Sequence, residues 1–121
     1  MVSVDPRLAG LDCNNLVVRF EFDASTLTQE GKDELDRHIP CFESKEGTVR
    51  IAGHADERGT TEYNLALGQR RAETIRAHLV GRNVLPSRIR TVSFGEEQPL
   101  NPDHDEKAWE ENRRGEVGVN E

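Results

Sequence analysis

The chain has 121 residues, of which 34% are hydrophobic and 32% are charged, and its net charge is −7. That length and hydrophobic content predict one domain with a modest core. The negative charge argues against a nucleic-acid-binding protein, because a basic patch would act against the field of the whole molecule. No apolar run approaches the ~18 residues of a membrane span, and residues 1–10 lack the basic and then apolar order of a signal peptide. We therefore expect the sequence as given to form a soluble domain.

The first third of the chain predicts a strand followed by a helix. Residues 16–22 (LVVRFEF) alternate apolar and polar side chains with a period of two, which is typical of a strand with one covered face. Residues 28–42 predict a helix with Thr28 as its N-cap and one apolar face, formed by Leu35, Ile39 and Phe42. Because proline disrupts a helix interior, Pro40 predicts that this helix ends or kinks there.

A second strand and the longest helix follow. Residues 48–54 (TVRIAGH) alternate again, and a turn that ends at Gly59 comes after them. Thr60 or Thr61 is expected to cap a helix over residues 62–80, for which Gly81 supplies a stop signal. A common stripe on this helix is formed by Leu65, Ala72, Ile75 and Leu79.

The remaining elements complete an alternating pattern. Residues 88–96 predict a third strand, residues 104–114 a short helix, and residues 115–120 a weak last strand containing Gly115 and Gly118. The order β-α-β-α-β-(α)-β predicts an α/β (α+β) two-layer sandwich with helices on one sheet face, because alternating strands leave the other face wet. Right-handed crossovers make the first three strands parallel, and the short last connection makes the fourth antiparallel.

This topology predicts where a site lies. In open α/β sheets, ligands gather beyond the carboxyl ends of the parallel strands. Residues 53–60 (GHADERGT) occupy that place after the second strand, and residues 23–27 (DASTL) occupy it after the first. An antiparallel fourth strand would begin there with residues 112–114, which include two arginines. Opposite charges are therefore expected to converge at one edge of the sheet.

Three segments carry a family resemblance. Residues 53–72 (GHADERGTTEYNLALGQRRA), 91–99 (TVSFGEEQP) and 104–114 (HDEKAWEENRR) resemble the OmpA-like peptidoglycan-binding domain, and within that family the peptidoglycan-associated lipoproteins. The similarity runs from about Val17 to Arg114. It implies a four-stranded mixed sheet in the order 1-4-2-3. We divide the chain into an N-terminal extension, residues 1–15, and the OmpA-like domain, residues 16–121.

The resemblance also implies a function. It implies noncovalent binding of the diaminopimelate-containing stem peptide of peptidoglycan, which anchors the outer membrane to the cell wall in a Tol-Pal-like system. A periplasmic, outer-membrane-associated location follows, with a membrane tether outside this sequence. Neither an enzymatic activity nor a cofactor is implied.

The ligand chemistry matches the charges. The free end of meso-diaminopimelate carries an ammonium and a carboxylate on one carbon, so its receptor needs an anion and a cation a few Å apart. Asp56 and Arg71 match the Asp and Arg of the family's site, where Asp56 would take the ammonium and Arg71 would clamp the carboxylate through a charge-assisted fork. Backbone N–H groups near Ala55 and at the helix N-terminus are expected to assist. The resemblance places further residues around the pocket, namely Phe22, Asp23, Arg58, Asn64 and Leu67.

Other interpretations remain open. Without the resemblance, Asp56 and Arg58 are interpreted as loop charges and Leu67 as core. We interpret His54 as a hydrogen-bonded structural residue. Tyr63 and Trp109 are interpreted as packing, although Tyr63 lies near enough to the helix cap to touch a ligand.

Two other function classes are alternatives. A metal-assisted hydrolase would group several N and O ligands, but no HExxH motif or cysteine pair at diagnostic spacing supports it. Its ligands would be His54, Asp56, Glu57, His104 and Asp105. The other alternative is a protein–protein module that binds a TolB-like periplasmic propeller without binding the wall.

The two cysteines are expected at the same end of the domain, opposite the ligand edge. Cys13 precedes the first strand, and Cys41 ends the helix that returns antiparallel to it. The oxidising periplasm would permit a disulfide between Cys13 and Cys41. Two buried free thiols are the alternative.

Overall fold

The architecture is a four-stranded sheet with the order β1-β4-β2-β3, in a computed structural model that describes residues 6–120. The strands are β1 (Leu16–Arg19), β2 (Thr48–His54), β3 (Ile89–Gly95) and β4 (Arg114–Asn120). β2 pairs parallel with β3, while β4 pairs antiparallel with both β1 and β2. The predicted strand directions and order are confirmed. Residues 1–5 of the expected extension and residue 121 of the expected domain lie outside the described residues.

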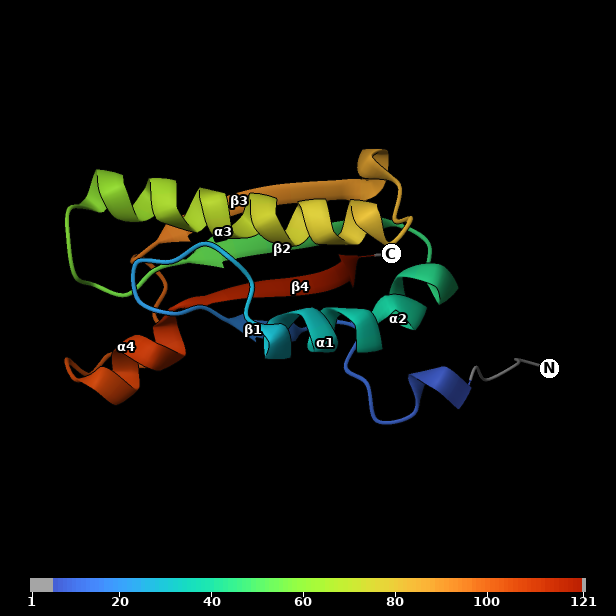
Figure 1. Ribbon diagram of the computed structural model, residues 1–121, viewed down its shortest axis with the longest axis horizontal. Helices are drawn as coiled ribbons and strands as arrows, with labels where there is room; N and C mark the ends of the chain where they lie inside the picture. Colours follow the sequence, from blue (N-terminus) through green and yellow to red (C-terminus); the bar gives the residue numbers. More distant parts are fainter. Residues whose placement is uncertain (1–5, 121) are drawn as a thin grey trace.

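The helices make the second layer. They are α1 (Gln29–Arg37), α2 (Ile39–Ser44), α3 (Thr61–Gly81) and α4 (Glu106–Asn112), with single 3-10 turns η1 (Pro6–Leu8) and η2 (Pro86–Arg88). α1 and α3 cover one face of the sheet, α4 lies at the end where β4 begins, and α2 lies at the opposite end (Figure 1). The predicted two-layer sandwich is confirmed. No helix within residues 6–120 is long and apolar enough to cross a membrane.

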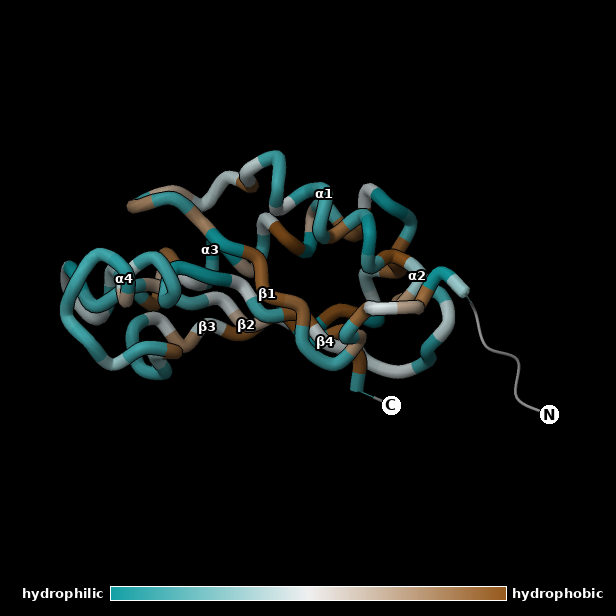
Figure 2. Tube along the Cα trace, turned by 90° about the horizontal axis from the view of Figure 1, so that it is seen from below, coloured by the Kyte–Doolittle hydropathy of each residue, from teal (hydrophilic) through white to brown (hydrophobic). Residues whose placement is uncertain are grey.

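The core lies between the sheet and the helices. Alternate strand residues point into it, because successive side chains in a strand face opposite sides, and the residues of α1, α2 and α3 that meet them are equally buried. Each buried aliphatic or aromatic side chain contributes roughly 1.5–3 kcal/mol. Figure 2 shows the hydrophobic residues along the strands, whereas α4 is mainly hydrophilic. The core includes Leu16, Val18, Leu35, Phe42, Val49, Ile51, Ala72, Ile75, Leu79, Val117 and Val119.

The helix starts follow from local capping. The Thr28 hydroxyl accepts a hydrogen bond from the backbone N–H of Gly31 (3.0 Å), and Thr60 does the same for Tyr63 (3.1 Å). Each such cap contributes about 1 kcal/mol. The predicted break near Pro40 is also confirmed, because α1 ends at Arg37 and Pro40 lies in the first turn of α2, where a missing N–H costs little.

The structure refines three of the expected elements. β1 ends at Arg19 rather than at residue 22, and the chain turns at Asp23, whose φ is 55°. Phe22 consequently leaves the covered face and is 59% exposed. α3 runs through Gly81, and the left-handed residue after it is Asn83 (φ 71°). β4 is a central strand of seven residues rather than a weak one.

The glycines of β4 explain why that strand stays regular. A Cβ atom at Gly118 would lie 2.2 Å from the carbonyl oxygen of Asn14, and one at Gly115 would lie 2.3 Å from Cδ1 of Ile75. The missing side chains therefore let the N-terminal segment and α3 approach the centre of the sheet closely.

The N-terminal segment before β1 is bound to the α2 end of the domain. A disulfide joins Cys13 to Cys41 of α2, with their Cα atoms 5.4 Å apart. The backbone N–H of Val119 donates to the carbonyl of Cys13 (3.1 Å). Leu8 and Leu11 also pack against the core cluster.

Candidate functional site

A cleft of about 270 Å³ opens where β1 and β2 end and α3 begins. The loop after β1 supplies two of its lining residues, the loop after β2 supplies four, and the remainder come from α3. All of the residues expected at the site line this one cleft, and Gly59 and Tyr63 join them. The lining residues are Phe22, Asp23, Ala55, Asp56, Arg58, Gly59, Tyr63, Asn64, Leu67 and Arg71.

Asp56 is the buried anion of the cleft, with 5% of its surface exposed. Its Oδ1 accepts from the backbone N–H (3.0 Å) and Nε (3.1 Å) of Arg58, and its Oδ2 accepts from Nη2 of Arg58 (2.8 Å). A second guanidinium lies nearby, because Nη1 of Arg113 is 3.7 Å from Oδ2 of Asp56. Burial alone would raise the pKa of Asp56, but the hydrogen bonds from Arg58 and the charges of both arginines lower it overall. Asp56 is therefore ionised at neutral pH.

Arg58 is held by two aromatic rings as well as by Asp56. Its guanidinium carbon lies 4.1 Å from the ring centroid of Phe22 and 4.2 Å from that of Trp109. A guanidinium between two ring faces gains cation–π attraction in addition to its ion pair. The Trp109 Nε1–H donates to Glu57 (3.1 Å), which fixes the orientation of that ring. The sequence interpretation of Trp109 as packing therefore missed its contact with the site.

Arg71 is the buried cation, and none of its surface is exposed. Its Nε donates to the carbonyl of Ala24 (2.8 Å), Nη1 to that of His54 (2.8 Å) and Nη2 to that of Glu21 (3.1 Å). A guanidinium has five N–H bonds, so one remains on each Nη nitrogen. Burial lowers the pKa of Arg71 to about 10, and the Asp56 charge opposes this shift. The side chain therefore stays charged at neutral pH.

The rim and floor of the cleft are partly polar and partly apolar. The hydroxyl of Tyr63 donates to the carboxylate of Asp23, and the amide of Asn64 donates to Glu96 (3.0 Å). Leu67 is 5% exposed and forms an apolar part of the wall. The position of Tyr63 in the first turn of α3 was the sequence signal for its presence here.

The backbone N–H of Ala55 itself donates to the carbonyl of Gly95 (2.9 Å), and assistance from other N–H groups near it stays a prediction. The expectation of a hydrogen-bonded His54 ring was wrong. His54 is buried as expected, but neither ring nitrogen has a hydrogen-bond partner among residues 6–120. Its ring stacks instead on Phe94, with centroids 5.5 Å apart.

The residues of the metal alternative do not gather at one point. His104 contacts Glu57 (2.6 Å), whereas His54 stacks on Phe94. Within the described part of the chain, no three His, Cys, Asp or Glu side chains are grouped so that they could hold a metal ion.

Comparison with known proteins identifies the family. Residues 19–113 match the model of the OmpA family. The chain belongs to the OmpA family. This OmpA-family chain is 44% identical over 98 residues to the peptidoglycan-associated lipoprotein of Pseudomonas aeruginosa, covering 81% of this chain and 58% of that protein. It is also 44% identical over 98 residues to the peptidoglycan-associated lipoprotein of Haemophilus influenzae, covering 80% and 64% respectively.

A solved structure has the same fold. The crystal structure of the peptidoglycan-associated lipoprotein from Burkholderia pseudomallei superposes with a TM-score of 0.81 at 38% identity, covering 86% of this chain and 89% of that one. The OmpA-family chain spans 58% to 64% of the length of the two relatives compared by sequence.

Proposed function

We propose that this domain binds peptidoglycan noncovalently and thereby helps to hold the outer membrane to the cell wall, without catalysing a reaction. The names of its relatives and its OmpA-family membership support the general role. A periplasmic, outer-membrane-associated location belongs to the same proposal. The observation that carries it is the presence of a buried anion, Asp56, and a buried cation, Arg71, in the wall of one cleft.

The ligand of this cleft is the free end of meso-diaminopimelate in the stem peptide. Asp56 takes its ammonium group. The carboxylate of the same carbon meets the two N–H bonds that Arg71 has not donated to backbone carbonyls, supported by the nearby charge of Arg113. Because both side chains are buried, each charge acts at short range and with little screening.

Binding requires a change at Arg58. Arg58 donates hydrogen bonds to both oxygens of Asp56. The ligand ammonium must share or replace these contacts, while the rings of Phe22 and Trp109 continue to hold the Arg58 guanidinium. The ion pair with Arg58 compensates the Asp56 charge before the ligand arrives, since an unpaired buried carboxylate is costly.

Co-sedimentation with purified diaminopimelate-type sacculi tests the assignment. Asp56→Asn and Arg71→Ala are expected to lose wall binding, since removal of one partner of a buried charge pair costs roughly 2–5 kcal/mol of affinity. Asp103→Asn and Arg90→Ala are matched controls, because Asp103 and Arg90 are exposed and outside the cleft. Wild-type sedimentation of folded Asp56→Asn would refute the proposal.

Stem-peptide selectivity gives a test that needs no variant. A stem peptide with lysine in place of meso-diaminopimelate at its third position keeps the terminal ammonium but lacks the carboxylate on the same carbon. Loss of a charge-assisted partner costs roughly 1.5–3 kcal/mol, which predicts roughly 10-fold to 150-fold weaker binding of the lysine peptide. Titration calorimetry with matched soluble muropeptides measures the ratio, and equal affinities would show that Arg71 does not read the carboxylate.

A TolB-like periplasmic propeller is a second candidate partner, within a Tol-Pal-like system. Phe22 and Tyr63 line the cleft and are 59% and 44% exposed, and large exposed aromatic side chains are enriched at protein interfaces. A partner seated on them would cover the cleft. A soluble muropeptide is therefore expected to compete with the propeller, and simultaneous binding of both would argue against a shared surface.

A further inference from the structure

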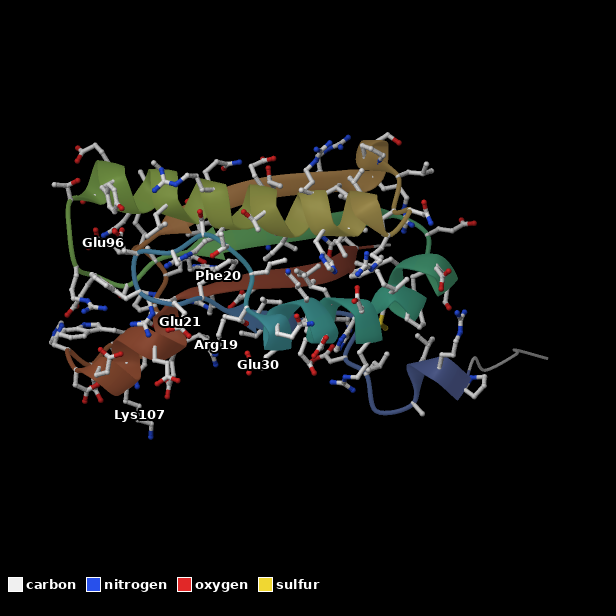
Figure 3. All side chains as sticks on the ribbon, in the orientation of Figure 1. Arg19, Phe20, Glu21, Glu30, Glu96 and Lys107 are labelled. Atoms are coloured by element: carbon white, nitrogen blue, oxygen red, sulfur yellow. A yellow bond between two sulfur atoms is a disulfide. The ribbon has the colours of Figure 1, made fainter. Side chains whose placement is uncertain are left out.

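A groove of about 500 Å³ runs along β1, between α1 and α4, and shares no lining residue with the cleft. β1 is an edge strand of the sheet that residues 6–120 form, because β4 lies on one side of it and no strand lies on the other. Figure 2 shows β1 between α1 and α4. In Figure 3, Arg19, Glu21 and Glu30 lie near one another in this region, whereas Lys107 of α4 projects away from them.

The backbone of β1 presents unused hydrogen-bonding groups to this groove. In the antiparallel pair with β4, the N–H of Phe20 donates to the carbonyl of Arg113 (2.9 Å), and Val18 pairs with Gly115 in the same register. Since the backbone groups of alternate residues point to opposite sides of a strand, those of Val17 and Arg19 point outward. Such an edge can accept another extended chain.

Most of the charged residues that line the groove are acidic. α1 contributes Glu30 and Glu34, and α4 contributes Glu106 and Glu110. Each pair has i,i+4 spacing, so both members lie on the same helix face and repel each other by a few tenths of a kcal/mol. Glu21 adds a fifth carboxylate after β1. Five carboxylates therefore line the groove beside an open strand edge, and two of them are ion-paired, Glu34 with Arg37 (3.0 Å) and Glu106 with Arg113 (3.4 Å).

The cations that line the groove are already engaged. Arg113 donates through Nε to the carbonyl of Phe20 (3.1 Å) and through its Nη atoms to Glu106 (3.4 and 3.5 Å). Arg19 donates to the backbone carbonyl of Glu111. Among residues 6–120, the carboxylates of Glu21, Glu30 and Glu110 have no hydrogen-bond or ion-pair partner that would neutralise them.

We propose that this groove binds an extended, basic peptide segment of a partner protein, which adds a strand to the free edge of β1. The backbone of the peptide pairs with the outward groups of Val17 and Arg19. Its alternate side chains point toward α1 and toward α4, where lysines or arginines meet the glutamates on each wall. A second copy of this chain does not suit the groove, because it would bring two sets of five glutamates together.

The test uses a capped lysine–valine octapeptide and a second peptide of the same sequence that is N-methylated at alternate amides. Titration calorimetry at low salt is expected to show binding of the first peptide and at least about 10-fold weaker binding of the second, which has the same charge but lacks the donors of a strand. Amide resonances of Val17 and Arg19 are expected to shift in NMR spectra on binding.

Charge variants separate the groove from the general acidity of the protein. Glu30→Gln with Glu110→Gln is expected to weaken peptide binding at least about 10-fold. Glu46→Gln with Glu97→Gln removes the same charge at exposed positions outside the groove and is expected to leave affinity unchanged.

The proposal is overturned by absence of binding, by equal affinity for the N-methylated peptide, or by equal effects of the two double variants. Dimerisation of the Glu30→Gln, Glu110→Gln protein without peptide binding would show instead that the glutamates only keep the edge from pairing with another copy.

Discussion

Arg71 joins three segments that are far apart in the sequence. Its guanidinium donates to carbonyls in the loop after β1 and at the end of β2, while its own backbone belongs to α3. The helical pattern around Arg71 and the charge of its side chain are visible in the sequence. Its full burial and its three carbonyl partners are not, because they depend on how the loop after β1 folds back over α3.

Replacement of Arg71 by lysine tests whether the fork geometry or the charge matters. A lysine ammonium is a single donor centre and cannot meet three carbonyls in the plane of a guanidinium. At least one buried carbonyl then loses its partner, which costs about 1–3 kcal/mol. We expect Arg71→Lys to lower the free energy of unfolding in urea by that amount, and a change within experimental error would contradict this account.

His54 predicts an acid sensitivity of the fold. Burial, supported by the positive charge of Arg114, lowers the pKa of its imidazole from 6.5 to about 4, while Glu116 opposes this shift. The unfolded chain therefore binds a proton between pH 6.5 and about 4 that the folded protein excludes. Stability consequently falls as the pH decreases through this window, by about 3 kcal/mol in total.

Urea unfolding at a series of pH values measures this effect, and His54→Gln is the control. Because the glutamine side chain does not titrate, the slope of unfolding free energy between about pH 6.5 and about pH 4.5 should flatten in the variant, even if it is less stable throughout. The carboxylates with a lowered pKa, Asp56 among them, contribute mainly at lower pH. An unchanged slope in the variant would assign the acid sensitivity to other groups.

At the scale of elements, the contact between β2 and α3 sets the width of the cleft. A Cβ atom at Gly53 would lie 1.7 Å from the carbonyl oxygen of Gly68, so the strand and helix backbones touch where both residues are glycine. Asn64, Leu67 and Arg71 flank this contact on α3, and all three line the cleft. The packing distance between two elements therefore positions the site.

Gly53→Ala is expected to force α3 away from β2, because backbone atoms cannot yield as a flexible side chain would. Overpacking of this kind costs typically about 1–3 kcal/mol. Since the helix carries Arg71, wall binding should weaken together with stability. Gly81→Ala is the matched control, because a Cβ atom there has no neighbour within 4 Å. Wild-type stability of Gly53→Ala would contradict the close contact.

The elements themselves were largely predictable from the sequence, and the exceptions have physical causes. Apolar periodicity and capping residues located β2, β3 and α3 to within a residue or two. β1 proved shorter because Asp23 adopts a left-handed conformation that no pattern of hydrophobicity encodes. β4 was underestimated because its two glycines lower intrinsic strand propensity, whereas close packing against Ile75 and Asn14 requires them.

At the scale of the whole molecule, the cleft and the disulfide lie at opposite ends of the domain. The cleft lies at the end where α3 begins, and the disulfide between Cys13 and Cys41 joins the N-terminal segment to α2. Figure 1 shows the start of α3 and α2 at opposite ends of the molecule. Sequence topology placed the cleft at the carboxyl ends of the parallel strands, and the family resemblance was needed to assign a ligand to it. The cation–π contacts of the Arg58 guanidinium with two aromatic rings could not be predicted, because Phe22, Arg58 and Trp109 come from three separate segments.

Removal of the disulfide is therefore expected to reduce stability without altering the cleft. The bond closes a loop with a sequence separation of 28 residues, for which the chain-entropy model gives roughly 3–4 kcal/mol. Cys13→Ser with Cys41→Ser should lower the urea midpoint accordingly, whereas muropeptide affinity measured well below that midpoint should match the wild type. Addition of a reductant should destabilise the wild-type protein and leave the double variant unaffected, which separates loss of the cross-link from any effect of the serines. A fall in ligand affinity in the folded double variant would show that the two ends are coupled through the sheet.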